Sequence, residues 1–172
     1  MPLAVRGGLE PIMNAEWLDQ IEADLYGVDA MAEEIMAFTG QDAATVYRSL
    51  SHELHQTGWN IRRECARFGV TPHQFDEAML RLYRESEGFI YETLVGARNE
   101  IRSAKWRQIA RLLLGVYGGA VGSCKVLVYG DSVGSDSIYL RRLGFDVYYH
   151  DFDSTCSRFA FYRFEKRGLH IK

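Results

Sequence analysis

The chain has 172 residues, of which 47% are hydrophobic and 25% are charged, a composition that excludes wholesale disorder. Its 20 basic and 23 acidic residues give a net charge of −3, so no basic nucleic-acid-binding surface is expected. The longest apolar run, residues 112–122, is shorter than the roughly 20 residues that cross a bilayer, and no signal peptide is visible. Three scattered cysteines indicate neither a disulfide framework nor a zinc cluster, so we expect a cytoplasmic protein without a bound metal.

Residues 1–122 carry 12 basic and 17 acidic side chains, and their apolar residues recur at helical spacing. Asn14 is a suitable N-cap for the first helix, which Gly27 divides. A capping box at Thr71 and Gln74 predicts a later helix that starts at residue 72. This part is therefore predicted to be an N-terminal helical region. The helices are expected over residues 15–40, 42–57, 60–67, 72–87 and 89–114.

Residues 123–172 differ from the first part, because short apolar runs alternate with helical segments. The run 124–129 has the β-branched content of a buried parallel strand. A second strand is predicted over 145–150, and a third begins at 169–171. Helices are expected over 135–143 and 154–167. The alternation predicts an α/β fold for this part of the chain.

A glycine-rich turn, Gly130-Asp-Ser-Val-Gly134, follows the first predicted strand. Glycines allow unusual backbone angles and a close approach of ligand to the main chain. The helix that follows offers unpaired N–H groups at its N-terminus. Asp151 stands at the end of the second predicted strand, 21 residues after Gly130, where a carboxylate can accept both hydroxyls of a ribose. These parts together predict a nucleotide-like ligand.

In the order and spacing of these parts, residues 125–168 resemble the first half of a class I S-adenosylmethionine-dependent methyltransferase. The resemblance implies the first βαβα units of a Rossmann-like methyltransferase sheet, with S-adenosylmethionine as the methyl donor. It also implies methyl transfer to an unidentified small molecule rather than to a nucleic acid, and it assigns no catalytic residue. The implied donor-binding residues are Gly130, Asp131, Ser132, Gly134 and Asp151, with Phe152 as an apolar wall beside the adenine.

Two residues depart from the pattern of that family. Its turn is written G-x-G-x-G, whereas Ser132 stands here in place of the middle glycine. Val128 stands where many members have an acidic residue that contacts the methionine amino group. Asp131 and Asp136 are the two alternatives for that contact.

The number of strands leads to a further expectation. The sheet of this family has seven strands, whereas the sequence supplies two and the start of a third. Two parallel strands leave faces and edges uncovered, so we expect a fragment of a longer protein, truncated at Lys172. The alternative is that the N-terminal helices pack on a small sheet and that a partner chain, as in a homo-oligomer, supplies the rest.

Three other interpretations concern the same turn. A nicotinamide-binding motif, G-x-G-x-x-G, retains only Gly130 of its three glycines, so the methyltransferase spacing fits better. Gly130-Asp131-Ser132 also resembles the nucleophile block of GDSL-type esterases, with Ser132 as the nucleophile. That family has an Asp-x-x-His near its C-terminus, with the histidine as the base. Here the residue three positions before His170 is Arg167 rather than an aspartate. A helical binding module without catalytic chemistry is the remaining alternative.

Two clusters in the helical region are interpreted as structural. His52 and His55 are spaced i, i+3 rather than the i, i+4 of a zinc-protease helix, so with Glu53 they predict a polar helix surface. Basic residues between 98 and 111 predict a solvated helix face. Four aromatic residues are expected to pack in the core, with a substrate pocket as the alternative: Tyr83, Phe89, Tyr91 and Trp106.

Overall fold

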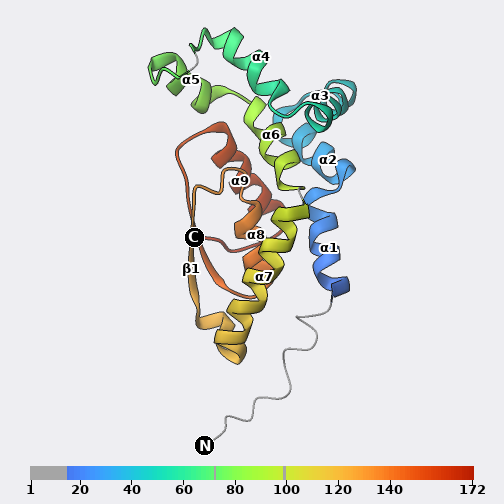
Figure 1. Cartoon of the computed structure of the whole chain (residues 1–172), viewed down its shortest axis with the longest axis vertical. Helices are drawn as coiled ribbons and strands as arrows, with labels where there is room; N and C mark the ends of the chain where they lie inside the picture. The colour runs from blue at the N-terminus through green and yellow to red at the C-terminus, as the bar shows by residue number, and fades with distance from the viewer. Residues whose placement is uncertain (1–14, 72, 99) are drawn as a thin grey trace, which may run out of the picture.

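The protein was studied as a computed structural model, which describes residues 15–71, 73–98 and 100–172. These residues are mostly helical and form nine α-helices, one short 3-10 helix and two strands (Figure 1). In chain order, the elements are α1 (Ala15–Tyr26), α2 (Val28–Thr39), α3 (Ala43–His55), α4 (Trp59–Phe68), α5 (Glu77–Glu85), α6 (Gly88–Ala97), α7 (Glu100–Tyr117), η1 (Gly118–Ser123), β1 (Lys125–Tyr129), α8 (Ser135–Arg142), β2 (Asp146–His150) and α9 (Thr155–Lys166).

The two strands are parallel, and Lys125 pairs with Asp146 at one end of the ladder. Parallel strands need a crossover connection, and here α8 supplies it. The C-terminal residue, Lys172, lies against the outer edge of β2. Its N–H donates to the carbonyl of Val147 at 3.1 Å, and its carbonyl accepts from the N–H of Tyr149 at 2.7 Å.

The predicted Rossmann-like methyltransferase sheet is wrong for this chain. The described residues form a mostly helical protein, and their sheet has the two strands β1 and β2 alone. Residues 169–171, the predicted third strand, are not a strand. The physical reason is that, among the described residues, two stretches combine β-branched, apolar composition with a parallel partner, whereas most of the others have helical spacing.

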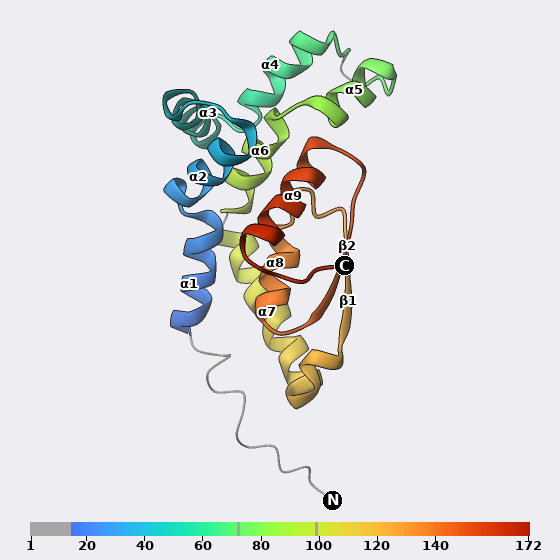
Figure 2. The same ribbon diagram turned by 180° about the vertical axis from the view of Figure 1, so that it is seen from behind.

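The sheet is covered on one face, which corrects the prediction of a fully buried first strand. In β1, Leu127 is 65% exposed and Tyr129 is 78% exposed, while Val126 and Val128 are half-buried. Figures 1 and 2 show why: α7, α8 and α9 lie between the sheet and α1, so the strands form one side of the molecule. β1 therefore presents alternate side chains to the helices and to solvent.

Two hydrophobic cores hold the fold together, and each joins residues from both sides of position 122. The first core combines Leu25 of α1 with Phe145 and with Phe164 of α9. The second core combines Ile35 of α2 with Phe159 of α9. Helix α9 contributes to both cores, so it connects the helical region to the sheet.

Local signals at the helix ends were partly misleading. Asn14, the predicted N-cap, lies outside the described residues. Gly27 separates α1 from α2 as predicted. The capping box at residue 71 does not start a helix. Instead, α5 begins at Glu77, because the Asp76 side chain accepts a hydrogen bond from the N–H of Met79 at 3.0 Å.

Glu53 is fully buried rather than part of a polar surface. Its carboxylate accepts hydrogen bonds from the N–H of Gly58 and from the N–H of Asn60 at 3.1 Å, and thereby caps the start of α4. His52 stacks on Trp59 with 4.1 Å between ring centroids. This side of α3 thus holds the α3–α4 corner together.

The basic residues of α7 do not all form a solvated face. The Arg107 guanidinium pairs with Asp19 at 2.6 Å and with Glu22 at 2.9 Å, both on α1. None of the described helices is both long enough and apolar enough to cross a membrane.

Candidate ligand-binding site

The turn after β1 alternates left-handed residues with ordinary ones. Gly130, Ser132 and Gly134 have φ values of 72°, 49° and 74°. A serine in this region carries strain of about 1–2 kcal/mol, because its Cβ crowds the backbone. Such strain persists only where the surroundings fix the conformation. A positive φ therefore occurs at all three positions at which the G-x-G-x-G pattern has glycine, although the middle residue here is serine.

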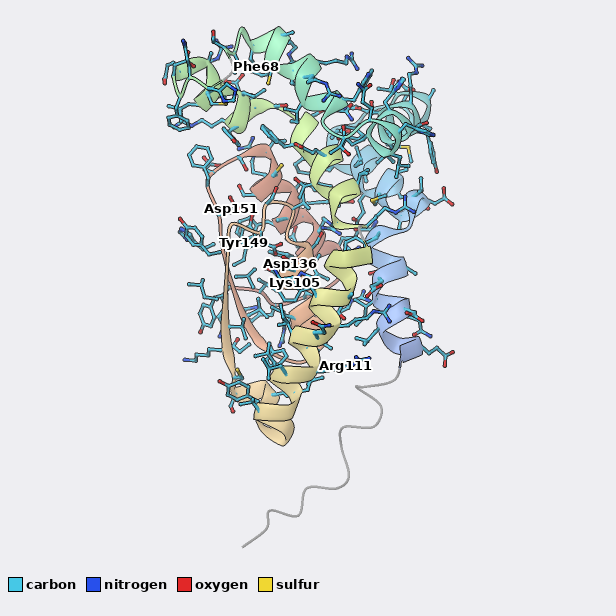
Figure 3. All side chains as sticks on the ribbon, viewed as in Figure 1. Phe68, Lys105, Arg111, Asp136, Tyr149 and Asp151 are labelled. Carbon is cyan, nitrogen blue, oxygen red and sulfur yellow. The ribbon has the colours of Figure 1, made fainter. Side chains whose placement is uncertain are left out.

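Neighbouring residues hold Ser132 in this conformation from two sides. Its N–H donates to Oδ2 of Asp151, the residue that directly follows β2. Its carbonyl accepts a hydrogen bond of 2.7 Å from the hydroxyl of Tyr149. Figure 3 shows Tyr149 and Asp151 together at the end of the sheet that faces α5. The ends of both strands are therefore tied to one another.

The two outer glycines of the turn serve different purposes. A Cβ placed on Gly134 would lie 2.5 Å from a ring carbon of Phe164 and 2.9 Å from Cβ of Ala160, both on α9. A Cβ placed on Gly130 would meet no described atom within 4 Å. Gly134 thus permits close packing of the turn on α9, whereas Gly130 borders open space in which a ligand can approach the backbone.

Asp131 faces away from that space. The residue is 5% exposed, and its carboxylate accepts hydrogen bonds from the N–H of Asp136 at 3.1 Å and of Ser137 at 2.7 Å. These N–H groups in the first turn of α8, which we expected to be open to a ligand, are therefore occupied. Burial, with a smaller contribution from the charge of Asp136, raises the pKa of Asp131 to about 6.

A cavity of about 350 Å³ lies where the turn, the end of β2 and α5 meet. It brings together four of the six predicted donor-site residues, and Asp131 and Gly134 do not line it. This volume is at the lower end of the range for small-molecule sites. The lining residues are Phe75, Leu80, Tyr83, Phe89, Gly130, Ser132, Asp151, Phe152, Ser154 and Cys156.

One wall of the cavity is aromatic. Tyr83 and Phe89 stack with 4.8 Å between ring centroids and 7° between ring planes. The ring of Phe152 meets Tyr83 edge-on at 6.4 Å. Two of the four aromatic residues expected in the core thus line the cavity. The other two pack elsewhere: the Tyr91 hydroxyl donates to Gln41, and Trp106 packs against Tyr139.

Four further residues line the cavity although no sequence pattern predicted them as site residues: Phe75, Leu80, Ser154 and Cys156. Leu80 and Tyr83 are three residues apart on one helix, a spacing that predicts a shared face but not what that face covers. Burial raises the pKa of the Cys156 thiol to about 12, so this cysteine is protonated at neutral pH.

The surroundings of Ser132 bear on the esterase alternative. The Ser132 hydroxyl lies 3.3 Å from the hydroxyl of Thr93, and among the described residues no histidine lines the cavity. The imidazole of His150, the nearest histidine in sequence, stacks on Tyr129 instead. A serine nucleophile needs an adjacent base, so this arrangement lacks a component of that chemistry.

The aspartate Asp151 is the one charged side chain in the cavity lining, within the described residues. Its Oδ1 accepts from the N–H of Phe152 at 2.6 Å, and its Oδ2 from Ser132. Each carboxylate oxygen has two lone-pair sites, so both retain acceptor capacity for a ligand. Elsewhere in the described residues, no group of three or more His, Cys, Asp and Glu side chains could hold a metal ion.

Comparisons of the chain with protein-family models, with curated proteins and with solved structures find no match.

Proposed function

We propose that this cavity binds S-adenosylmethionine and that the protein transfers its methyl group to a small-molecule acceptor. The observation that supports the proposal best is the composition of the cavity. One acidic side chain, an aromatic wall and an open stretch of glycine backbone meet around a space of about 350 Å³. A nucleoside with an attached amino-acid chain needs these three kinds of contact.

The ribose is assigned to Asp151. A carboxylate binds vicinal hydroxyls because its two oxygens can accept one hydrogen bond from each. Phe152 follows directly in the chain and is 45% exposed, so its ring is available to the adenine. The contact between Asp151 and the N–H of Ser132 keeps the carboxylate at the turn before any ligand arrives.

The aromatic pair suits the positive charge of the donor. A sulfonium group is a cation, and cations are attracted to the negative faces of aromatic rings. Tyr83 and Phe89 line the same cavity as Gly130 and Ser132 of the glycine turn. The product, S-adenosylhomocysteine, has an uncharged thioether sulfur and lacks this attraction. The cavity should therefore bind S-adenosylmethionine more tightly than S-adenosylhomocysteine.

The contribution of the protein to the reaction is positioning. Methyl transfer from a sulfonium is a direct displacement, and holding the two reactants in line supplies much of its acceleration. We assign no catalytic base. The largely apolar lining favours an acceptor without a negative charge. A reducing compartment, such as the cytoplasm, is part of this proposal, because all three cysteines are free.

Calorimetric titration with S-adenosylhomocysteine and S-adenosylmethionine tests the proposal. Asp151→Asn should weaken binding about tenfold or more, because a hydrogen bond to a charged group is worth about 1.5–3 kcal/mol. The matched control is Asp153→Asn, since Asp153 is exposed, pairs with Arg158 and does not line the cavity. Absence of binding to the unmodified chain, or equal affinity for Asp151→Asn, would refute the assignment.

A further inference from the structure

Arg163 of α9 is the largest side chain in the described protein that is completely buried. Its Nη1 donates to the carbonyl of Val133 at 2.7 Å and to the hydroxyl of Ser135 at 2.9 Å. These two residues flank Gly134, so a single guanidinium forms hydrogen bonds on both sides of the last glycine of the turn. Neither residue lines the cavity, and Arg163 therefore acts from behind the turn.

The charge of Arg163 is balanced from the helical region. Its Nε donates to Oε2 of Glu34 on α2 at 2.9 Å, and Glu34 is 1% exposed. Arg167 bonds the other oxygen of the same carboxylate and also reaches Asp24 of α1 at 3.1 Å. Helices α1 and α2 thus orient the arginine that holds the turn.

This arrangement is not the simplest way to stabilise a helix contact. A buried ion pair loses hydration that its mutual attraction only partly restores, and an apolar pair of similar volume is often as stable or more stable. The Nη2 atom of Arg163 also has no hydrogen-bond partner among the described residues. An incompletely satisfied buried arginine is better explained by the geometry that it imposes than by stability.

Other residues of α9 also contact the turn, which supports a geometric role for this helix. Ala160 and Phe164 lie three residues before and one residue after Arg163, and both contact the position of Gly134. Tyr149 and Asp151 hold Ser132 of the same turn by hydrogen bonds from the end of β2. The strained turn is therefore held by contacts from α9 and from the end of β2.

We propose that Arg163 is a positioning residue, which together with Glu34 holds the turn in its ligand-binding shape. The effect on ligand affinity rests on the proposed function, whereas the effect on the turn itself does not. The helical region then contributes to the site in two ways: α5 and α6 supply the aromatic wall, and α2 orients the arginine behind the turn.

Amide hydrogen exchange of the unliganded protein tests the conformational part. In Arg163→Lys, the ammonium can pair with Glu34 but cannot also hydrogen-bond both Val133 and Ser135, which flank Gly134. Exchange at residues 130–135 should therefore become about tenfold faster than in the unmodified protein, a change expected for the loss of one charge-assisted hydrogen bond. Exchange in α1 should stay unchanged. A uniform increase throughout the chain, or none at the turn, would show a merely structural arginine and overturn the proposal.

Arg163→Met is the stronger variant, and Arg163→Lys decides the question if the methionine variant does not fold. Arg107→Met is the matched control, because Arg107 also joins two helices through carboxylates but does not contact the turn. The control should leave exchange at residues 130–135 unchanged, and an equal effect there would also overturn the proposal.

Titration of the same variants with S-adenosylhomocysteine tests the consequence for binding. Arg163→Lys should weaken binding about tenfold with a larger entropic penalty, because the ligand must then order the turn. If the unmodified chain does not bind this ligand, the proposed function fails and hydrogen exchange alone decides the role of Arg163. If it binds and Arg163→Lys binds equally well, the positioning role fails alone.

Discussion

Gly130 and Gly134 form a natural pair for separating backbone strain from packing. Their φ values are 72° and 74°, so alanine suffers the same left-handed strain at either position. That strain is about 1–2 kcal/mol. The smaller entropy of an unfolded alanine offsets about 0.4–1 kcal/mol of it. Gly130→Ala should therefore lower the free energy of unfolding by about 1 kcal/mol, since no described atom lies near its Cβ.

Gly134→Ala adds a clash to the same strain. Its Cβ would lie 2.5 Å and 2.7 Å from two ring carbons of Phe164 and 2.9 Å from Cβ of Ala160. Overpacking of a well-packed core costs about 1–3 kcal/mol, so the total loss should be about 2–4 kcal/mol. Phe164 belongs to the core that joins α9 to α1, and it cannot move without disturbing that contact.

Urea unfolding of both variants gives the two free energies directly, provided that the slope with denaturant is unchanged. The calorimetric affinity for S-adenosylhomocysteine, measured on the same samples, should fall in Gly130→Ala because the added methyl group enters the cavity. Equal destabilisation by the two substitutions would refute the packing argument. Greater destabilisation by Gly130→Ala would also show that the turn does not lie on α9 as described.

Three further predictions concern buried or strained groups. Ser132→Gly should raise the free energy of unfolding by about 0.5–1 kcal/mol in urea unfolding, because glycine relieves the strain at φ 49°, and it should retain the binding of S-adenosylhomocysteine. The free energy of unfolding should fall as the pH rises from about 4 to about 6, because the pKa of Asp131 is raised to about 6 in the folded state. Over this range the folded state binds more protons at Asp131 than the unfolded chain does, so a rising pH favours unfolding. In Asp131→Asn, the free energy of unfolding should vary less across the same range. Glu53→Ala should destabilise the protein by about 2–3 kcal/mol in thermal or urea unfolding, because two backbone N–H groups and the Asn60 amide lose a charged acceptor.

Each of these predictions has an outcome that contradicts it. Loss of stability in Ser132→Gly would mean that the serine side chain holds the turn rather than straining it. A pH profile of Asp131→Asn that parallels the unmodified protein would place the titrating group elsewhere. A loss below about 0.5 kcal/mol in Glu53→Ala would show that water replaces the cap, as it does at exposed helix ends.

Short-range patterns predicted the strands and helices of residues 123–172 well. Both strands and the helices α8 and α9 lie within one or two residues of their expected positions, because β-branched runs, glycine stops and the Ser154 cap act over a few residues. The same patterns placed Gly130 and Asp151 at the ends of adjacent strands. Parallel pairing then brings these residues to one edge of the sheet, as the cavity lining shows.

Other features depend on contacts between distant segments. Asp131 and Asp151 are the same residue type, and local sequence patterns do not distinguish their roles. In the structure, Asp131 caps α8 and Asp151 lines the cavity, because the backbone conformation at each position sets the direction of its side chain. Leu80 of α5 and Phe75, which precedes that helix, reach the cavity because α5 packs against α9. The predicted sheet was wrong because a resemblance in one segment says nothing about which layers the rest of the chain will form.

Local patterns in the sequence were enough to predict the two strands, the helices α8 and α9, the position of the glycine turn and the acidic residue after the second strand. These features depend on neighbours a few positions apart. Contacts between distant segments set the remaining features: Gly134 packs against α9 whereas Gly130 borders open space, and one face of the sheet is covered. The same kind of contact buries Arg163 against the turn, with a partner, Glu34, that lies 129 residues away in the sequence. A buried charge is stable only where distant segments supply its partners, and no local pattern records that pairing.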